Sequence, residues 1–141
     1  MLVAPGFDVI ARSDRDDARV GGGSLIIARN NLVTRPIHFP GGASNACGFE
    51  IEIGGHTYSF MLVYRPPSVT GHDDEILGGY IRDFVSSSKN PIVLGDFNLP
   101  SVNWATRVAS DLSDKSLMCC LNELNLCSWL NSLLEGETSW I

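Results

Sequence analysis

Residues 47–64 read CGFEIEIGGHTYSFMLVY and carry the clearest structural signal in the chain. Apolar residues alternate with Glu50 and Glu52, and a second alternating run follows Gly54-Gly55. Two glycines between alternating runs are typical of a tight turn between antiparallel strands. The pattern predicts a β-hairpin over residues 47–64, in which the first strand has one solvated face and the second is more central in its sheet.

The segments on either side extend this hairpin into a layered protein. Residues 24–28 (SLIIA) and 91–95 (PIVLG) read as buried strands, and residues 73–88 have apolar residues at helical spacing after an acidic first turn. Ser113 is the expected cap of a second helix, and residues 126–130 read as one more strand. The order of elements predicts an α/β (α+β layered) protein with a mixed sheet.

Both expected helices have an apolar face. In the first helix we expect this face to pack on the sheet, and its residues are Leu77, Ile81 and Phe84. In the second helix the apolar stripe consists of Leu117, Cys120, Leu121 and Leu124. The polar residues 99–112 between the third strand and this helix read as a loop.

The composition describes a folded, acidic protein. Its 141 residues suit one domain, and 44% hydrophobic with 18% charged residues exclude wholesale disorder. Apolar runs are shorter than the roughly 18 residues of a membrane helix, so no membrane partner is expected. The net charge of -6 argues against a nucleic-acid binder that works by charge alone. It does not exclude an enzyme that reaches phosphate through a metal ion.

The cysteines and the first residues of the chain indicate in which cellular compartment the protein is expected. Cys47, Cys119, Cys120 and Cys127 show no zinc-ligand spacing, and the last three lie among Leu and Met like buried small hydrophobes. The chain starts without the basic region of a signal peptide. These features predict reduced thiols in an intracellular protein of the nucleus or cytoplasm.

Asp96 and Asn98 directly follow the expected strand 91–95. Ligands in layered α/β proteins gather at the carboxyl ends of strands. Residues two apart on an extended segment point the same way, so this carboxylate and this amide can converge on a phosphate, a water or a metal ion. Asp can accept a proton from an attacking water, and Asn can donate to a phosphoryl oxygen. The alternative is an Asx turn that merely closes the strand.

Several motifs together resemble one known group of proteins. Residues 91–100 (PIVLGDFNLP), with Asn103-Trp104 shortly after, resemble the core motif of the endonuclease/exonuclease/phosphatase superfamily. More narrowly, they resemble the apurinic-like endonuclease domain of non-LTR retrotransposons. Residues 61–68 (MLVYRPPS) resemble a strand end of that group, and Asp14-Arg15 with Gly21–Gly23 resembles its glycine-rich strand start.

The resemblance covers roughly residues 7–130 and implies a fold. That fold is a partial four-layer α/β sandwich with mixed, mostly antiparallel sheets flanked by helices. Residues 1–141 are then expected to form a single, incomplete domain. Missing strands should leave apolar sheet surface exposed.

The resemblance also implies roles for individual residues. Asp96 matches the carboxylate that positions or activates the attacking water, and Asn98 matches the amide that binds the scissile phosphate. Both are the expected ligands of Mg²⁺. Tyr64 matches the tyrosine that hydrogen-bonds the phosphate, although a half-buried strand aromatic remains the alternative. Arg65 either lines the DNA groove or caps a loop. Tyr64, Asp96 and Asn98 are therefore expected to lie together at one end of the sheet.

The chain also departs from the pattern of the group. The group places an Asn and a metal-binding Glu on strands that precede the region where this chain begins, and Glu50 and Glu52 do not match that Glu. It ends with a Ser-Asp-His strand end that nothing here matches, since the last histidine is His72. His38, His56 and His72 read as surface residues. We therefore expect an incomplete metal site.

The resemblance implies metal-dependent nicking of DNA to prime reverse transcription, impaired in this chain. DNA is the implied partner, and a parent polyprotein would carry a reverse transcriptase. One alternative is a non-catalytic remnant of the domain, favoured by the missing Glu and His. Another is a phosphomonoesterase of the same superfamily, disfavoured by residues 64–67 (YRPP) and by Asn103-Trp104.

Overall fold

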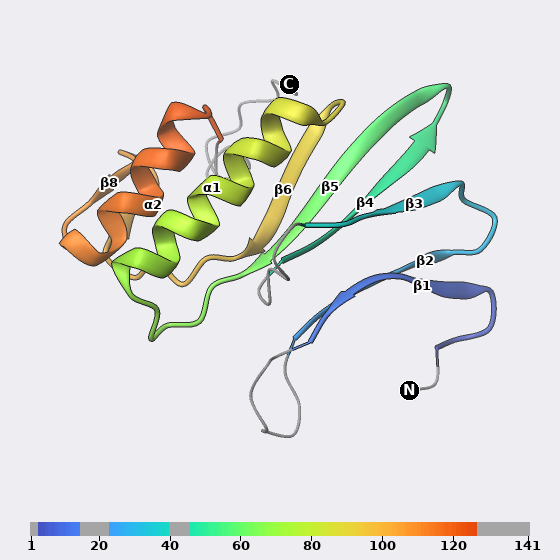
Figure 1. Ribbon diagram of the computed structural model, residues 1–141, viewed down its shortest axis with the longest axis horizontal. Coiled ribbons are helices and arrows are strands. Elements are labelled where there is room, and N and C mark those ends of the chain that lie inside the picture. Colours follow the sequence, from blue (N-terminus) through green and yellow to red (C-terminus); the bar gives the residue numbers. More distant parts are fainter. Residues whose placement is uncertain (1–2, 15–22, 40–45, 127–141) are drawn as a thin grey trace. The chain divides into compact units, whose positions relative to one another are not determined.

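The computed structural model describes residues 3–14, 23–39 and 46–126 (Figure 1). The chain divides into two compact units. The first unit comprises Met1–Pro66 and Asp83–Asn98, and the second comprises Pro67–Arg82 and Leu99–Ile141. Some features named above lie outside the described residues: Arg15, Gly21, Gly22 and Cys127. The strand expected over 126–130 also lies outside them, except for its first residue, Leu126. Within the described part of the chain, no helix is long and apolar enough to cross a membrane.

Among its described residues, the first unit contains six strands and the last turn of a helix. In chain order they are β1 (Phe7–Ser13), β2 (Ser24–Arg29), β3 (Thr34–Ile37), β4 (Ala46–Ile53), β5 (His56–Tyr64), the end of α1 (Gly71–Ser87) and β6 (Pro91–Asp96). The predicted hairpin is confirmed, because β4 and β5 pair antiparallel with Ile53 opposite His56. Gly54 and Gly55 form the turn with φ of 58° and 80°, which glycine adopts without strain.

The order of the larger sheet is β3-β4-β5-β6. β3 and β4 are antiparallel, whereas β5 and β6 are parallel because α1 connects them as a crossover. This arrangement confirms the mixed sheet. The strand predicted over 91–95 exists as β6, but the expectation that it is buried was wrong, since Leu94 is 49% exposed. The reason is that β6 lies at an edge of this sheet, among the residues that the structure describes.

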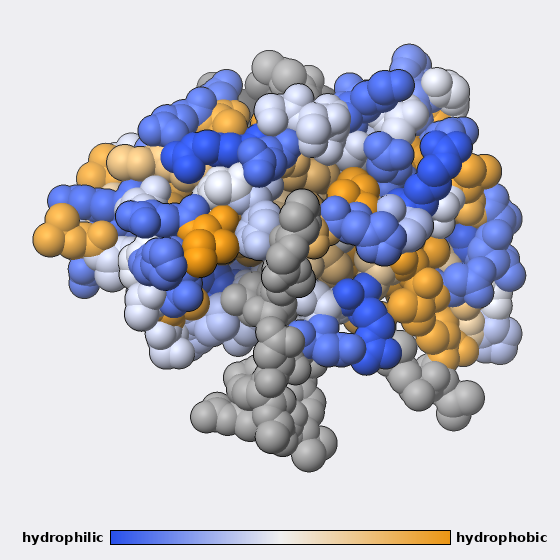
Figure 2. Space-filling model, in the orientation of Figure 1, coloured by the Kyte–Doolittle hydropathy of each residue, from blue (hydrophilic) through white to orange (hydrophobic). Residues whose placement is uncertain are grey.

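A second, two-stranded sheet of β1 and β2 packs against the first. β1 lies against β3 and β4, and β2 lies against β4 and β5. Its outer residues are apolar and exposed: Val9, Leu25 and Ile27 are 39%, 40% and 49% exposed. The expectation that the strand over 24–28 is buried was therefore wrong, since its residues alternate between half-buried and exposed. In Figure 2, patches of hydrophobic surface (orange) lie between hydrophilic residues (blue).

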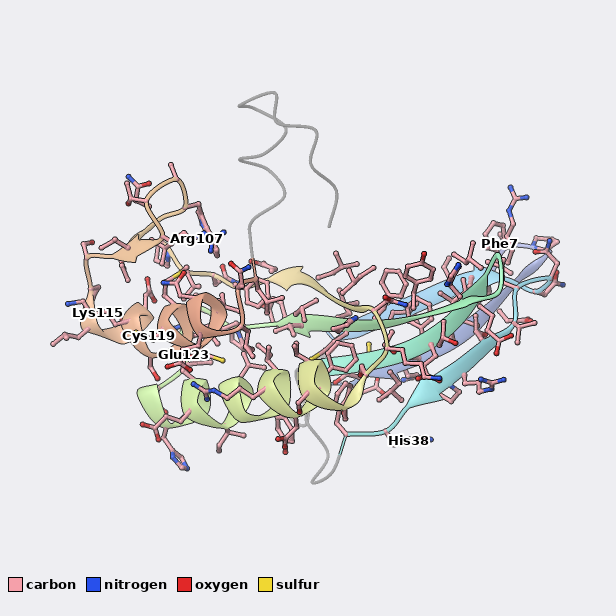
Figure 3. The ribbon with its side chains drawn as sticks, turned by 90° about the horizontal axis from the view of Figure 1, so that it is seen from above. Phe7, His38, Arg107, Lys115, Cys119 and Glu123 are labelled. Atoms are coloured by element: carbon pink, nitrogen blue, oxygen red, sulfur yellow. The ribbon has the colours of Figure 1, made fainter. Side chains whose placement is uncertain are left out.

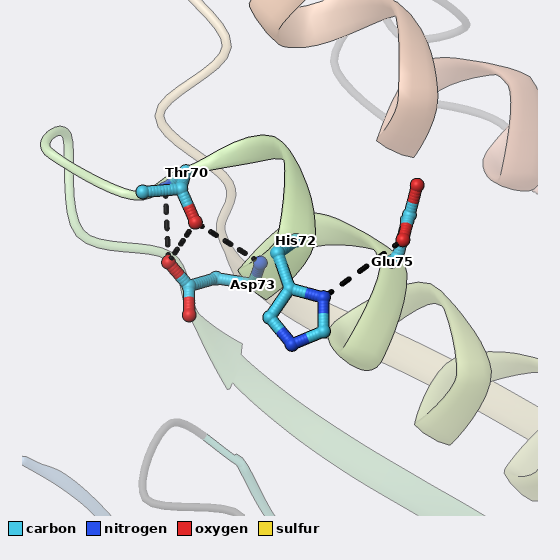
Figure 4. A network of polar contacts seen from close by, with 4 residues as sticks. All are labelled: Thr70, His72, Asp73 and Glu75. Atoms are coloured by element: carbon cyan, nitrogen blue, oxygen red, sulfur yellow. Dashed lines mark hydrogen bonds and ion pairs between the residues drawn. The ribbon is translucent and has the colours of Figure 1, made fainter.

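The helix predicted over 73–88 is α1, and its start is fixed by a reciprocal cap. The Asp73 backbone N–H donates to Thr70 Oγ1 at 3.4 Å, and the Thr70 backbone N–H and hydroxyl donate to Asp73 Oδ2 at 2.9 and 2.6 Å (Figure 4). These bonds satisfy donors at the helix start that have no partner within the helix. The hydrogen bonds from Thr70 lower the pKa of Asp73.

All three apolar residues of the expected α1 face are buried: Leu77, Ile81 and Phe84 are 8%, 0% and 4% exposed. Phe84 packs against Phe39, with ring centroids 6.3 Å apart. The Phe39 ring in turn lies over Gly48 of β4, where a Cβ would come within 3.1 Å of it. The last turn of α1 therefore packs on the sheet through Phe39, as predicted for Phe84.

Replacing Phe84 with Ala should destabilise the protein strongly. We expect the free energy of unfolding to fall by about 3–5 kcal/mol, because a large buried aromatic side chain is lost and a cavity remains. Urea denaturation of wild type and variant measures this loss. Leu112→Ala is the control, since Leu112 is 79% exposed and its loss should change stability by less than about 0.5 kcal/mol. Equal effects of the two substitutions would contradict the packing.

The second unit contains the first part of α1, then β7 (Val102–Asn103), β8 (Val108–Ala109) and α2 (Leu112–Glu123). The helices contact each other where Cys120 Sγ lies 3.5 Å from the Gly78 carbonyl oxygen, and Arg82 forms an ion pair of 2.9 Å with Glu123. The loop predicted over 99–112 was wrong in part, because β7 and β8 form a short antiparallel pair within it.

Two expectations for α2 need correction. Its cap is Asp111 and not Ser113, because the Asp111 carboxylate accepts the Ser113 backbone N–H at 3.0 Å. Cys119 is exposed, whereas Cys120 is buried (Figure 3). Cys119 lies outside the buried face of α2, which includes Leu117, Met118, Cys120 and Leu121. Burial raises the pKa of the Cys47 and Cys120 thiols, and the three described cysteines, Cys47, Cys119 and Cys120, are free thiols.

Candidate active site at the ends of β5 and β6

The structure brings Tyr64, Asp96 and Asn98 together at one end of the larger sheet. Tyr64 ends β5 and Asp96 ends β6, and the two are register partners on these parallel strands (Figure 1). Partners in register point to the same face of a sheet. Asp96 is exposed and Tyr64 is half-buried, so both side chains can reach solvent at this edge. Asn98 follows two residues later, beyond the end of β6, so the expectation of one extended segment through Asp96 and Asn98 was wrong.

Gly95 allows the two strands to approach at this point. It is the register partner of Val63, and a Cβ at position 95 would lie 2.0 Å from the Val63 carbonyl oxygen. A Cβ does not approach a backbone oxygen this closely in proteins, so the residue before Asp96 must lack a side chain. The glycine is therefore what places Asp96 beside Tyr64.

Asn98 occupies a tight turn after β6. Its φ is 44°, and its backbone N–H donates to Asp96 Oδ1 at 3.2 Å. This is the Asx turn that the sequence left open as an alternative. The Asn98 side chain reaches across to β5, where Nδ2 donates to the Arg65 carbonyl oxygen at 2.7 Å. Asp96 and Asn98 therefore form the Asx turn and are also candidate site residues.

Arg65 lies in the interior of the protein. It is 3% exposed, and its guanidinium Nη1 donates to the carbonyl oxygens of Asn98 at 2.5 Å and Phe97 at 3.4 Å. The Arg65 backbone N–H donates to the Asp96 carbonyl oxygen at 2.8 Å. This geometry favours the loop-capping alternative for Arg65 over contact with a DNA groove.

A family model described as endonuclease-reverse transcriptase matches residues 58–140, which include most of β5, all of β6 and the residues just described. The chain belongs to the endonuclease-reverse transcriptase family. The resemblance to retrotransposon endonucleases is therefore confirmed. No match was found among the curated proteins.

Solved structures agree on the fold of this family member. Six chains match, among them the endonuclease domain of TRAS1, a telomere-specific non-LTR retrotransposon. The TM-score is 0.61 with 21% sequence identity, over 86% of this chain and 53% of that one. This likeness confirms the predicted layered α/β fold of the endonuclease/exonuclease/phosphatase type. The chain spans about half of the length of the TRAS1 domain.

Nucleases of this family are generally metal-dependent, but the residues described here do not make a complete metal site. No group of three His, Cys, Asp or Glu side chains forms within residues 3–14, 23–39 and 46–126. The side chains of Asp96 and Asn98 offer three oxygen atoms at most, whereas Mg²⁺ prefers six oxygen ligands in octahedral geometry. Glu50 pairs in register with Ser59, and His56 starts β5, so both lie away from the strand end that carries Tyr64.

The sequence left two roles open for Arg65, contact with a DNA groove or a loop cap, and it did not predict that the side chain is buried. Arginine is almost always exposed, so its burial was not expected. The signal was present in its neighbour Pro66, which ends the strand and leaves Arg65 at the point where β5 and the turn after β6 meet.

Proposed function

We propose that these residues form part of a DNA endonuclease site, within a single, incomplete domain spanning residues 1–141. The ancestral reaction is metal-dependent nicking of DNA to prime reverse transcription, in a polyprotein that also carries a reverse transcriptase and acts in the nucleus or cytoplasm. The observation that supports this proposal is the register pairing of Tyr64 with Asp96 at the carboxyl ends of two parallel strands.

Each site residue has a proposed task that its chemistry allows. Asp96 accepts a proton or a hydrogen bond from the attacking water, because its carboxylate is exposed at the strand end. The Tyr64 hydroxyl donates a hydrogen bond to a phosphate oxygen. Asn98 and Asp96 are the proposed metal ligands, with Mg²⁺ as the proposed ion, and no step is assigned to that ion because their ligand set is incomplete.

A non-catalytic remnant of the same domain is the second candidate function. It is supported by the lack of any three-residue metal cluster among the described residues. The two candidates differ in turnover, but a remnant that keeps this strand end also keeps its capacity to contact phosphate.

Contact with DNA can be tested by comparing two tyrosines of the same strand. Tyr64→Phe should raise the dissociation constant for a short DNA duplex roughly tenfold, because a hydrogen bond to a charged phosphate is lost. Fluorescence anisotropy of labelled DNA in Mg²⁺ buffer measures this change. Tyr58→Phe is the matched control, since Tyr58 lies near the opposite end of β5 and should leave affinity unchanged.

Two outcomes would contradict the proposed function. Equal effects of Tyr64→Phe and Tyr58→Phe would remove Tyr64 from the phosphate contact. An affinity of the wild-type chain for DNA too weak to measure, even at low ionic strength where charged contacts are strongest, would remove DNA as the partner.

A further inference from the structure

We propose that Arg65 is a positioning residue, whose buried guanidinium holds the turn after β6 in the geometry that presents Asp96 and Tyr64. This inference rests on the proposed function, because it concerns the same strand end. It assigns Arg65 no contact with DNA.

Because Arg65 is buried, its guanidinium must be hydrogen-bonded to other groups of the protein. A cation that is 3% exposed must have its donors satisfied by protein acceptors, because an unpaired buried charge is costly. Two of these acceptors are the carbonyl oxygens of Phe97 and Asn98. Both belong to the short turn that follows Asp96, so the guanidinium acts on the backbone that carries the carboxylate.

The bonds between the two segments are reciprocal. The Arg65 side chain donates to the turn, and the Asn98 side chain donates back to the Arg65 carbonyl oxygen. A third bond joins the Arg65 backbone N–H to the Asp96 carbonyl oxygen. These hydrogen bonds therefore connect the end of β5 to the turn after β6.

These hydrogen bonds hold Asn98 in a left-handed backbone conformation. Its φ is 44°, in a region that Asn adopts more readily than most residues other than glycine. In this conformation its N–H reaches Asp96 Oδ1, which orients the carboxylate. Arg65 suits this task better than Lys would, because a planar guanidinium presents several donors in a fixed arrangement.

Residue-resolved amide hydrogen exchange on the full chain tests this role. In Arg65→Met, the amides of residues 65 and 98 should exchange roughly 10- to 100-fold faster, the factor that corresponds to a hydrogen bond from a charged donor. Amides inside β4 and β5, such as Met61, should keep their exchange rates. Arg65→Lys should have an intermediate effect at residues 65 and 98. Arg35→Met is the control, because the exposed Arg35 pairs with Glu52 and should leave both amides unchanged.

Two results would overturn the proposal. A uniform increase over the whole sheet would show that Arg65 supports overall stability alone, and unchanged exchange at Asn98 would show that the turn does not depend on it. If Arg65→Met does not fold, the contrast between Asn98 and Met61 in Arg65→Lys decides in the same way. The measurement uses no DNA, so a failure of the proposed DNA contact would leave its result interpretable.

Discussion

Purified alone, the 141-residue chain is expected to nick supercoiled DNA weakly or not at all in the presence of Mg²⁺. Cleavage of a phosphodiester requires an activated water, stabilisation of charge on the phosphoryl group and help for the leaving group. The described residues bring Asp96, Asn98 and Tyr64 to the strand end, without a three-residue metal cluster. Loss of one preorganised electrostatic group commonly costs about 10²–10³-fold in rate.

The size of the defect follows from how catalytic groups act together. Losses within one catalytic unit are not additive, so lacking both the metal carboxylate and the histidine that the resemblance implies would not cost the product of two factors. A defect of at least about 10²-fold is expected even so. Conversion of supercoiled plasmid to the nicked form, followed over time on gels, measures it.

Asp96→Ala and a control carboxylate separate the outcomes of this assay. Robust nicking that disappears in Asp96→Ala but persists in Asp8→Ala would contradict the prediction, because it would show that other residues complete the site. Asp8 is an exposed residue of β1 and serves as the matched control. Nicking that survives in both variants indicates a contaminating nuclease and leaves the prediction standing.

Local patterns in the sequence were sufficient to predict the elements that build this site. The alternation around Gly54-Gly55 predicts the hairpin, because side chains on a strand alternate between two faces and only one face of β4 tolerates Glu50 and Glu52. The strand end at Asp96 follows from an apolar run that stops at polar residues. The order of strands and helices predicts a mixed sheet, and the parallel pairing of β5 with β6 across α1 agrees with it.

The features that the sequence did not predict depend on tertiary position. The burial of β6 was overestimated because an apolar run reads the same at the centre and at the edge of a sheet. Arg65 is buried because two carbonyl groups far along the chain accept its donors, and no local pattern records such partners. The helix cap is Asp111 and not Ser113, and the sequence could not decide between them because Asp and Ser are both preferred at this position.

Replacement of Gly95 with Ala is expected to have the largest effect on stability. The new Cβ would lie 2.0 Å from the Val63 carbonyl oxygen, and the atoms in conflict are backbone atoms that cannot rotate away. β6 must then separate from β5, which breaks the pairing next to Asp96 and exposes apolar surface. We expect a loss of more than about 4–5 kcal/mol in the free energy of unfolding, in the exceptional range for a single substitution. Urea denaturation measures it.

Gly79→Ala is the matched control, because it adds the same methyl group in the interior of α1, where no atom lies within 4 Å of the new Cβ. It should raise stability by about 0.5–1 kcal/mol, since Ala loses less conformational freedom than Gly in a helix. If Gly95→Ala were as stable as the wild type, β6 would not be held tightly to β5. The close pairing of Tyr64 with Asp96, on which the proposed site depends, would then not be a fixed feature of the protein.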